Sequence, residues 1–289
     1  MRLESIPCLI EPIFPKVGLI AIAGCSDTGK SNLMRQLCQS IVAGESTFLG
    51  YKINAEHKGA IYVSTEDESN AMSRLLAMQN EGLKYPWSSM GNLHYLFDTS
   101  NLLIDIEALL KAYPIDLIVN DAFADVFSKD INQTNQVRSF LTDFSNLAST
   151  YKCLFVFIHH TGKASETKAP NKNSILGSQG FEARMRTVAM LTKHSSIANY
   201  RYFCIVKGNY LPDHMKNEAQ ELQFDEYMTF SLTGRHEMIE NLSKDDAHKH
   251  KEELVLKLYG EGKSQSSIAK TLGLSQSTVS RIIGLVKYL

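Results

Sequence analysis

A short apolar run that passes directly into a glycine-rich segment is the feature that most constrains the fold of this chain. The run covers residues 18–23, and the segment that follows it, Gly24-Cys25-Ser26-Asp27-Thr28-Gly29-Lys30-Ser31, fits the pattern G-x-x-x-x-G-K-[S/T]. From residue 30 to about 43, apolar side chains recur at helical spacing. In a strand, glycine-rich turn and helix of this kind, backbone N–H groups and the helix N-terminus enclose phosphate groups. The sequence therefore predicts a phosphate-binding loop over residues 24–31.

Further apolar runs alternate with helical patterns along the chain. The runs cover residues 60–63, 117–119, 154–158, 188–191 and 202–206, and the helical patterns cover 71–79, 104–113 and 137–150. Strands that alternate with helices predict an α/β fold of the RecA-like kind, with a mostly parallel sheet flanked by helices. The last two runs have no helix between them, so we expect antiparallel hairpins at one edge of the sheet. Residues 1–17 contain three prolines and predict an irregular lead-in.

Composition and charge exclude several classes of protein. The chain has 289 residues, of which 44% are hydrophobic and 21% charged, unlike a disordered chain or a coiled coil. Its 30 Lys and Arg against 31 Asp and Glu give a formal net charge of -1. The whole molecule is therefore not a polycation that binds nucleic acid by charge alone. Charge is uneven, because residues 244–289 carry eight basic and five acidic side chains, a net charge of +3 (8 − 5).

Cysteine usage and hydropathy bear on the cellular compartment. The five cysteines form no C-x-x-C pair, which favours a reduced compartment without disulfides or a zinc site. The sequence begins without a signal-peptide pattern, and its apolar runs are too short to span a membrane. We therefore expect a cytoplasmic protein with no membrane partner.

The predicted phosphate loop indicates that ATP and Mg²⁺ are the cofactors. Lys30 is expected to neutralise the β- and γ-phosphates, and the hydroxyl of Ser31 to ligate Mg²⁺. Asp121 ends an apolar strand and is expected to hold the Mg²⁺ shell, with an ordinary strand-end Asp that caps the next turn as the alternative. Other residues expected to contact the nucleotide are Gly24, Ser26, Asp27, Thr28, Gly29 and Asn32.

Two further strand ends supply candidate catalytic groups. Glu66 follows the second strand, where a carboxylate can polarise a water in line with the γ-phosphate, and Asp67 is the alternative base. His160 follows the strand 154–158 and is expected to act as a neutral donor that senses the γ-phosphate. A histidine satisfied by backbone groups is the alternative, and metal binding by the pair His159 and His160 is disfavoured because no third ligand is suitably spaced.

Together these motifs resemble a known family. The phosphate loop, the acidic end of the second strand (Ser64-Thr65-Glu66-Asp67), the strand before Asp121 and the segment Phe157-Ile158-His159-His160-Thr161-Gly162-Lys163 resemble the RecA-like ATPase core. Within it, the chain resembles the RepA-type hexameric helicases of plasmids, with DnaB-type replicative helicases as broader kin. The resemblance covers roughly residues 10–235.

The resemblance implies nucleotide sites between the subunits of a ring, with a homo-hexamer expected. Arg186 lies where the family has an arginine finger that reaches the γ-phosphate on the adjacent subunit, and Arg184 is the competing candidate. Lys207 resembles a second cation that acts on the neighbouring site. The loop 161–174 is expected to face the channel, where its three lysines would follow the backbone of single-stranded DNA: Lys163, Lys168 and Lys172.

The end of the chain matches a helix-turn-helix over residues 265–282. Ser275 is a suitable N-cap for the second helix, which would enter the major groove of duplex DNA. Side chains of that helix expected to face bases or phosphates are Gln276, Ser277, Ser280 and Arg281. A three-helix module that binds another protein is the alternative. The predicted organisation is an ATPase core over 1–240, a linker over 241–250 and a helix-turn-helix domain over 251–289.

Three functions fit these predictions. The first is an ATP-driven DNA helicase or translocase in the replication of a plasmid, phage or mobile element. The second is an ATP-switched regulator that binds duplex DNA through the helix-turn-helix. The third is a recombination or repair ATPase that assembles on single strands.

Overall fold

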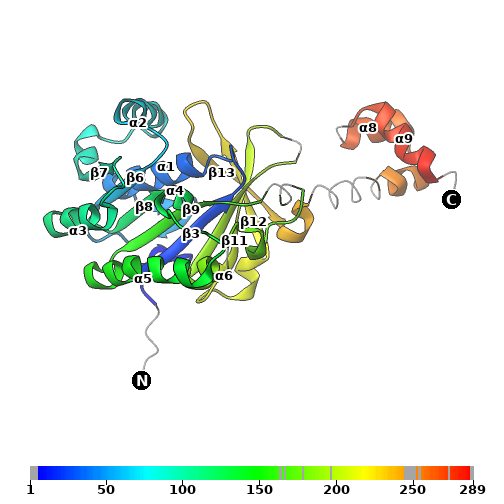
Figure 1. Cartoon of the computed structure of the whole chain (residues 1–289). Helices are drawn as coiled ribbons and strands as arrows, with labels where there is room; N and C mark the ends of the chain where they lie inside the picture. The colour runs from blue at the N-terminus through cyan, green and yellow to red at the C-terminus, as the bar shows by residue number, and fades with distance from the viewer. Residues whose placement is uncertain are drawn as a thin grey trace, which may run out of the picture. The chain divides into compact units, whose positions relative to one another are not determined.

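The computed structural model divides into two compact units. It describes residues 6–162, 165, 167–177, 179–195, 197–243, 252, 255–272 and 274–286. The first unit comprises residues up to 166 and Pro170–Ile239, and the second comprises Thr167–Ala169 and Glu240–Leu289. Each unit is described separately (Figure 1). No helix among the described residues is long and apolar enough to cross a membrane.

A nine-stranded sheet forms the centre of the first unit, in the order β13-β12-β11-β10-β3-β9-β8-β6-β7. The parallel strands are β3 (Gly18–Gly24), β6 (Ala60–Ser64), β7 (Leu93–Leu96), β8 (Leu117–Asp121), β9 (Leu154–His160) and β10 (Thr187–Lys193). The antiparallel strands are β11 (Tyr200–Gly208), β12 (Glu218–Phe224) and β13 (Phe230–Met238). The prediction of a mostly parallel sheet with antiparallel hairpins at one edge is confirmed.

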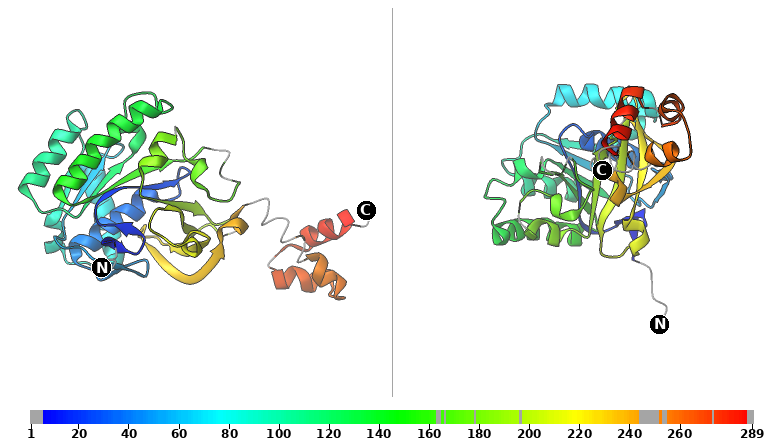
Figure 2. Two further views of the ribbon diagram at one scale, coloured as in Figure 1. Left: turned by 90° about the horizontal axis from the view of Figure 1, so that it is seen from below. Right: turned by 90° about the vertical axis from the view of Figure 1, so that its right-hand side faces the viewer.

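Helices cover both faces of this sheet (Figures 1 and 2). They are α1 (Lys30–Ala43), α2 (Ser69–Leu83), α3 (Leu102–Ala112), α4 (Phe123–Val126), α5 (Thr134–Tyr151) and α6 (Gln179–Arg184), with 3-10 helices η1 (Trp87–Asn92), η3 (Lys172–Ser174), η4 (Asp213–Lys216) and η5 (Ile239–Leu242). Leu33 and Leu37 of α1 share one buried cluster with Ile20 and Val156 of the sheet. On the other face, Phe144 of α5 packs edge-on against Phe155 and Phe157 of β9. Alternating strand residues thus supply both halves of the core.

The prediction of an irregular lead-in over residues 1–17 was wrong for its described part. Residues in this segment form β1 (Cys8–Glu11) and β2 (Phe14–Pro15), which belong to a small four-stranded sheet with β4 (Thr47–Phe48) and β5 (Tyr51–Ile53). Leu9, Ile10 and Phe14 are completely buried in the main core. Burial of these apolar side chains stabilises short strands between the prolines, which lie at strand ends or turns.

The second unit is helical. Its elements are α8 (Gln265–Leu272), α9 (Gln276–Val286) and the helical residues 255–260. Their apolar side chains form a separate core: Val255, Ile268, Ala269, Val279, Ile282 and Ile283. Ser275 Oγ accepts a hydrogen bond from Thr278 N at 3.2 Å and so caps the start of α9.

Candidate nucleotide-binding site

The predicted phosphate loop joins β3 to α1 at the carboxyl end of the parallel strands. Two glycines permit its shape. Gly24 has φ +157°, and a Cβ there would lie 2.3 Å from the carbonyl oxygen of Leu191. Gly29 has φ +95° and precedes α1, and a Cβ there would lie 2.8 Å from the ring of Phe230. Larger residues at either position would therefore displace backbone or ring atoms.

Lys30 is held inside this loop. Its side chain is buried, and Nζ donates a hydrogen bond to the carbonyl oxygen of Cys25 at 2.8 Å. Burial lowers the pKa of Lys30, whereas the nearby carboxylates of Asp121 and Glu66 oppose that shift. The ammonium group is therefore placed among negative partners that a phosphate chain can replace.

The loop opens onto a cavity of about 550 Å³, a volume suited to a nucleotide. Most predicted nucleotide and catalytic residues line it: Ser26, Asp27, Gly29, Lys30, Ser31, Asn32, Glu66, Asp121 and His160. Gly24 and Thr28 lie in the loop itself, and Thr28 Oγ1 donates to the carbonyl of Cys25 at 3.1 Å. Asp67 is not among the lining residues, so Glu66 is the better placed of the two candidate bases.

Ser31 and Asp121 supply the oxygen ligands that suit Mg²⁺. The ion commonly binds one or two carboxylates together with phosphate oxygens and water. Among the described residues there is no group of three or more His, Cys, Asp or Glu that could hold a metal without such help. A single carboxylate beside a hydroxyl and a phosphate loop therefore fits a nucleotide-bound Mg²⁺ rather than a metal bound by protein alone.

The two histidines that end β9 have different surroundings. His159 is buried against the rings of Phe123 and Phe181, and burial lowers its pKa to about 4. Its Nδ1 accepts a hydrogen bond from the backbone N of His160 at 2.9 Å. His160 lines the cavity, and burial and the charge of Lys30 lower its pKa, so its ring is neutral at pH 7.

Sequence reasoning missed the polar contacts that tie neighbouring strand ends together. Thr65 Oγ1 donates to Asp125 Oδ2 at 2.6 Å and accepts from the backbone N of Ala122 at 3.1 Å. Its backbone N donates to the carbonyl of Asp121 at 2.9 Å. These bonds fix the segment of Glu66 beside that of Asp121. Thr65 stood next to the predicted base in the sequence, but its partners depend on the strand order.

The structure also adds an apolar end to the cavity, formed by Ile158, Phe224 and Met228. Phe224 stacks on Phe230 with ring centroids 4.7 Å apart, and the guanidinium carbon of Arg201 lies 5.4 Å from the Phe224 centroid. Phe224 and Met228 come from the β12–β13 hairpin, which the sequence indicated only as an edge of the sheet.

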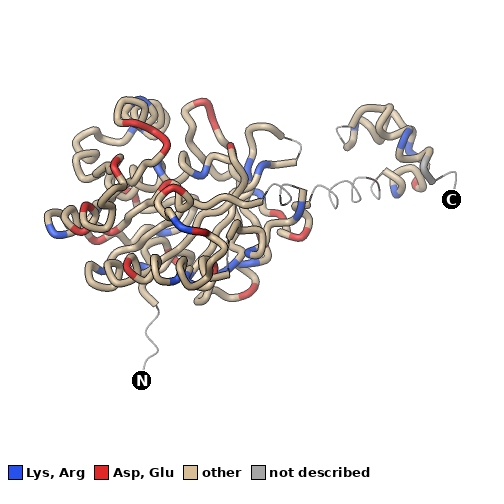
Figure 3. The backbone as a smooth tube through the Cα atoms, viewed as in Figure 1, with Lys and Arg blue, Asp and Glu red and all other residues tan. Residues whose placement is uncertain are grey.

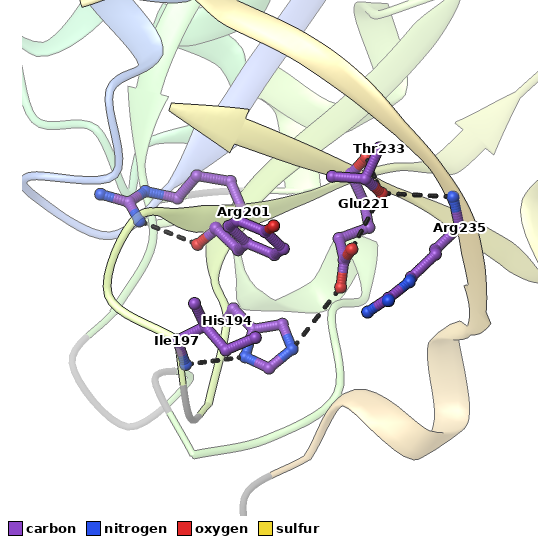
Figure 4. Close-up of polar contacts among 7 residues, drawn as sticks. His194, Ile197, Arg201, Glu221, Thr233 and Arg235 are labelled. Atoms are coloured by element: carbon purple, nitrogen blue, oxygen red, sulfur yellow. Dashed lines mark hydrogen bonds and ion pairs between the residues drawn. The ribbon is translucent and has the colours of Figure 1, made fainter. Parts of the chain in front are cut away.

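Arg201 connects that edge to the phosphate loop. Its Nε donates to the carbonyl of Thr28 at 3.0 Å, and one terminal nitrogen donates to the carbonyls of Ala198 and Tyr200 at 2.7 and 2.8 Å. Figure 4 shows Arg201 beside a second polar group, in which Glu221 accepts from Thr233 at 2.8 Å and lies 3.7 Å from His194. The β10–β11 hairpin therefore supports the nucleotide loop.

Arg186 and Lys207 do not lie at this site. Arg186 precedes β10, level with Leu19 of β3, so about 16 Å of strand separates it from Gly24 (five residues of about 3.3 Å each). Its guanidinium lies 5.9 Å from the ring centroid of Tyr210. Lys207 Nζ forms an ion pair with Glu182 Oε1 at 2.9 Å. Both cations lie at the opposite end of the strands from their own phosphate loop.

The competing arginine and the predicted DNA-contacting lysines were also located where the structure describes them. Arg184 is exposed, and its guanidinium donates to Thr142 Oγ1 at 2.5 Å. Lys172 forms a 3.9 Å ion pair with Glu182, and Lys168 is exposed. Lys163 lies outside the described residues. Figure 3 shows basic and acidic side chains interspersed over the first unit, in line with the balanced composition.

The fold and the cavity together define a P-loop ATPase domain of the RecA-like fold. The chain belongs to the AAA domain family, whose model matches residues 2–166. Among solved structures, it is similar to the ATPase domain of a DnaB-like helicase, with a TM-score of 0.59, 12% identity and coverage of 80% of this chain and 92% of that one. It is also similar to the KaiC-like protein PH0186 from Pyrococcus horikoshii OT3, with a TM-score of 0.55, 19% identity and coverage of 80% and 98%. No curated protein matches the chain.

Proposed function

We propose that this chain is a Mg²⁺-dependent ATPase that drives a DNA motor of the RepA-like helicase type, in the replication of a plasmid, phage or mobile element. One observation carries the nucleotide part. Lys30, Ser31, Glu66, Asp121 and His160 come from four separate segments and line a single cavity at the carboxyl ends of parallel strands. Open α/β sheets bind their ligands at this edge.

Each residue has a role that follows from its chemistry. Lys30 neutralises phosphate charge, and Ser31 and Asp121 hold Mg²⁺, which supplies further charge neutralisation when it is bound with ATP. Glu66 accepts a proton from the attacking water. The neutral ring of His160 donates a hydrogen bond to the γ-phosphate side of the cavity, and Phe224 and Met228 contact the nucleoside.

Arg186 and Lys207 are proposed to act on the nucleotide of a neighbouring subunit in a ring, with six subunits as the expected number. Their place at the far end of the strands supports a role in trans, because neither side chain can reach its own phosphate loop. An arginine so placed would stabilise charge that develops on the transferred phosphoryl group.

A mixing experiment tests this arrangement. Glu66→Gln and Arg186→Ala are each expected to be inactive alone, but rings that contain both variants would have some interfaces with an intact glutamate and arginine. Recovered ATP hydrolysis in the mixture supports action in trans. If the mixture stays as inactive as either variant, Arg186 does not complete a neighbour's site. Arg184→Ala is the matched control, and its loss of activity instead would assign the role to Arg184.

DNA contact is proposed at two places. Lys163, Lys168 and Lys172 would follow a single strand by charge. In the second unit, Gln276, Ser277, Ser280 and Arg281 are exposed on α9, in support of contact with duplex DNA. This second unit, with its own core and a serine-capped helix, also favours an alternative function as an ATP-switched regulator that binds duplex DNA.

Steady-state ATP hydrolysis without DNA, with single strands and with duplex separates the two functions. The motor predicts stimulation by single strands and unwinding of a forked duplex that is lost in Lys30→Ala. The regulator predicts sequence-specific duplex binding without unwinding, lost when residues 251–289 are removed. Absence of stimulation by single strands would contradict the motor.

A further inference from the structure

One buried tyrosine bonds to the carboxylate that is assigned to the Mg²⁺ shell. Tyr62 lies in the middle of β6 and is completely buried. Its phenol donates a hydrogen bond to Asp121 Oδ2 at 2.6 Å, although 59 residues separate the two in sequence. The contact arises because β6 and β8 are adjacent and parallel, with Tyr62 opposite Val119 and Ser64 opposite Asp121.

The same phenol reaches the helix that carries the other Mg²⁺ ligand. Tyr62 Oη lies 3.4 Å from the carbonyl oxygen of Ser31, in the first turn of α1. Burial and the charge of Asp121 raise the pKa of Tyr62 well above its ordinary range. The phenol therefore stays protonated and donates to the ionised carboxylate, which gives a short, charge-assisted bond. Among the described residues, Tyr62 is the one side chain that donates a hydrogen bond to Asp121.

We propose that Tyr62 is a positioning residue for Mg²⁺: its phenol fixes the Asp121 carboxylate beside the first turn of α1, so that the carboxylate and the Ser31 hydroxyl are set for the ion before it binds. The proposal rests on the proposed function as a Mg²⁺-dependent ATPase. With Oδ2 held by the phenol, Oδ1 serves the ion or its water. Groups that orient metal ligands in this way commonly change metal affinity or activity by about 10–100-fold when they are removed.

The neighbouring strand provides a matched control. Tyr95 of β7 lies opposite Tyr62 in the sheet, with ring centroids 5.9 Å apart. Its hydroxyl is also buried, but it has no hydrogen-bond partner among the described residues. Tyr62→Phe removes a hydroxyl and the bond to Asp121, whereas Tyr95→Phe removes a hydroxyl of the same kind without breaking a bond. A purely space-filling role for Tyr62 predicts that the two variants behave alike.

The test measures binding of a fluorescent, slowly hydrolysed ATP analogue by the full chain, with Mg²⁺ and with EDTA. For the wild type and Tyr95→Phe, we expect Mg²⁺ to tighten binding by the same factor. For Tyr62→Phe, we expect that factor to fall by about 10–100-fold, with the affinity in EDTA unchanged because the phosphate loop is intact. Thermal unfolding of each variant checks that the fold is retained.

Two results would overturn the proposal. One is a Tyr62→Phe variant that keeps the full gain from Mg²⁺, and the other is an equal loss of affinity in Mg²⁺ and EDTA, which would show a general disturbance of the site. A wild type whose binding does not respond to Mg²⁺ would instead contradict the proposed function. The failure of the inference and the failure of the function are therefore distinguishable.

Discussion

Replacement of Arg201 by methionine should loosen the phosphate loop from the antiparallel edge of the sheet. The guanidinium is buried and donates to three carbonyl oxygens, of Thr28, Ala198 and Tyr200. Methionine matches much of the length and apolar volume of the arginine stem but has no donor. Arg201→Met therefore removes the hydrogen bonds and leaves most of the packing against Phe224.

The three carbonyls contribute unequally. Thr28 is buried, so its carbonyl loses a charge-assisted bond of about 1.5–3 kcal/mol without replacement by bulk water. The carbonyls of Ala198 and Tyr200 belong to more exposed residues, where water can take the place of the donor, so each loss costs about 0.5 kcal/mol. The expected fall in the free energy of unfolding is therefore about 3 kcal/mol, with weaker ATP binding because the loop is less well held.

Urea unfolding and ATP-analogue binding measure both effects. Arg235→Met is the matched control, because Arg235 lies in the same region but is exposed (Figure 4). The control should change the free energy of unfolding by less than about 0.5 kcal/mol. If Arg201→Met is as mild as Arg235→Met in both assays, the bond to Thr28 does not support the loop and the reasoning is refuted.

Three further predictions concern other parts of the chain. The pKa of His159 falls to about 4 on folding, so the unfolded chain takes up its proton first, and the free energy of unfolding should decline by about 3 kcal/mol as the pH falls from about 6.5 to 4; urea titrations should show a flatter profile for His159→Leu. Glu182→Gln removes the charged partner of Lys207 and should raise amine labelling of that lysine, read by mass spectrometry, by about fivefold for about 1 kcal/mol, while labelling of Lys216 stays constant. Ile268→Ala removes a fully buried side chain at a cost of about 2–5 kcal/mol, so duplex binding should be lost in gel-shift assays while basal ATP hydrolysis is kept; retained duplex binding would contradict a role for this unit.

The parts of the site that the sequence predicted are those whose signal is local. The loop 24–31 combines a strand, glycines and a helix start within a few residues, and Glu66 and Asp121 each end an apolar strand. Parallel strands bring such ends to one edge, so their proximity in the cavity was predictable.

The contacts that were missed depend on strand order and register. Tyr62 looks like one more apolar residue of a buried strand, and its bond to Asp121 exists only because β6 and β8 are neighbours. Arg201 likewise reaches Thr28 from 173 residues away. The strands β1 and β2 were missed because proline punctuation outweighed a few apolar residues whose burial depends on the rest of the core.

Phosphate release from Mg²⁺-ATP by the wild type and by Lys30→Ala tests the central claim most directly, with Lys58→Ala as a control outside the cavity. The account predicts hydrolysis by the wild type and the control, stimulated by single-stranded DNA, and loss of hydrolysis in Lys30→Ala although the fold is retained. Hydrolysis that persists unchanged in Lys30→Ala would contradict the assignment of this cavity as the ATP site.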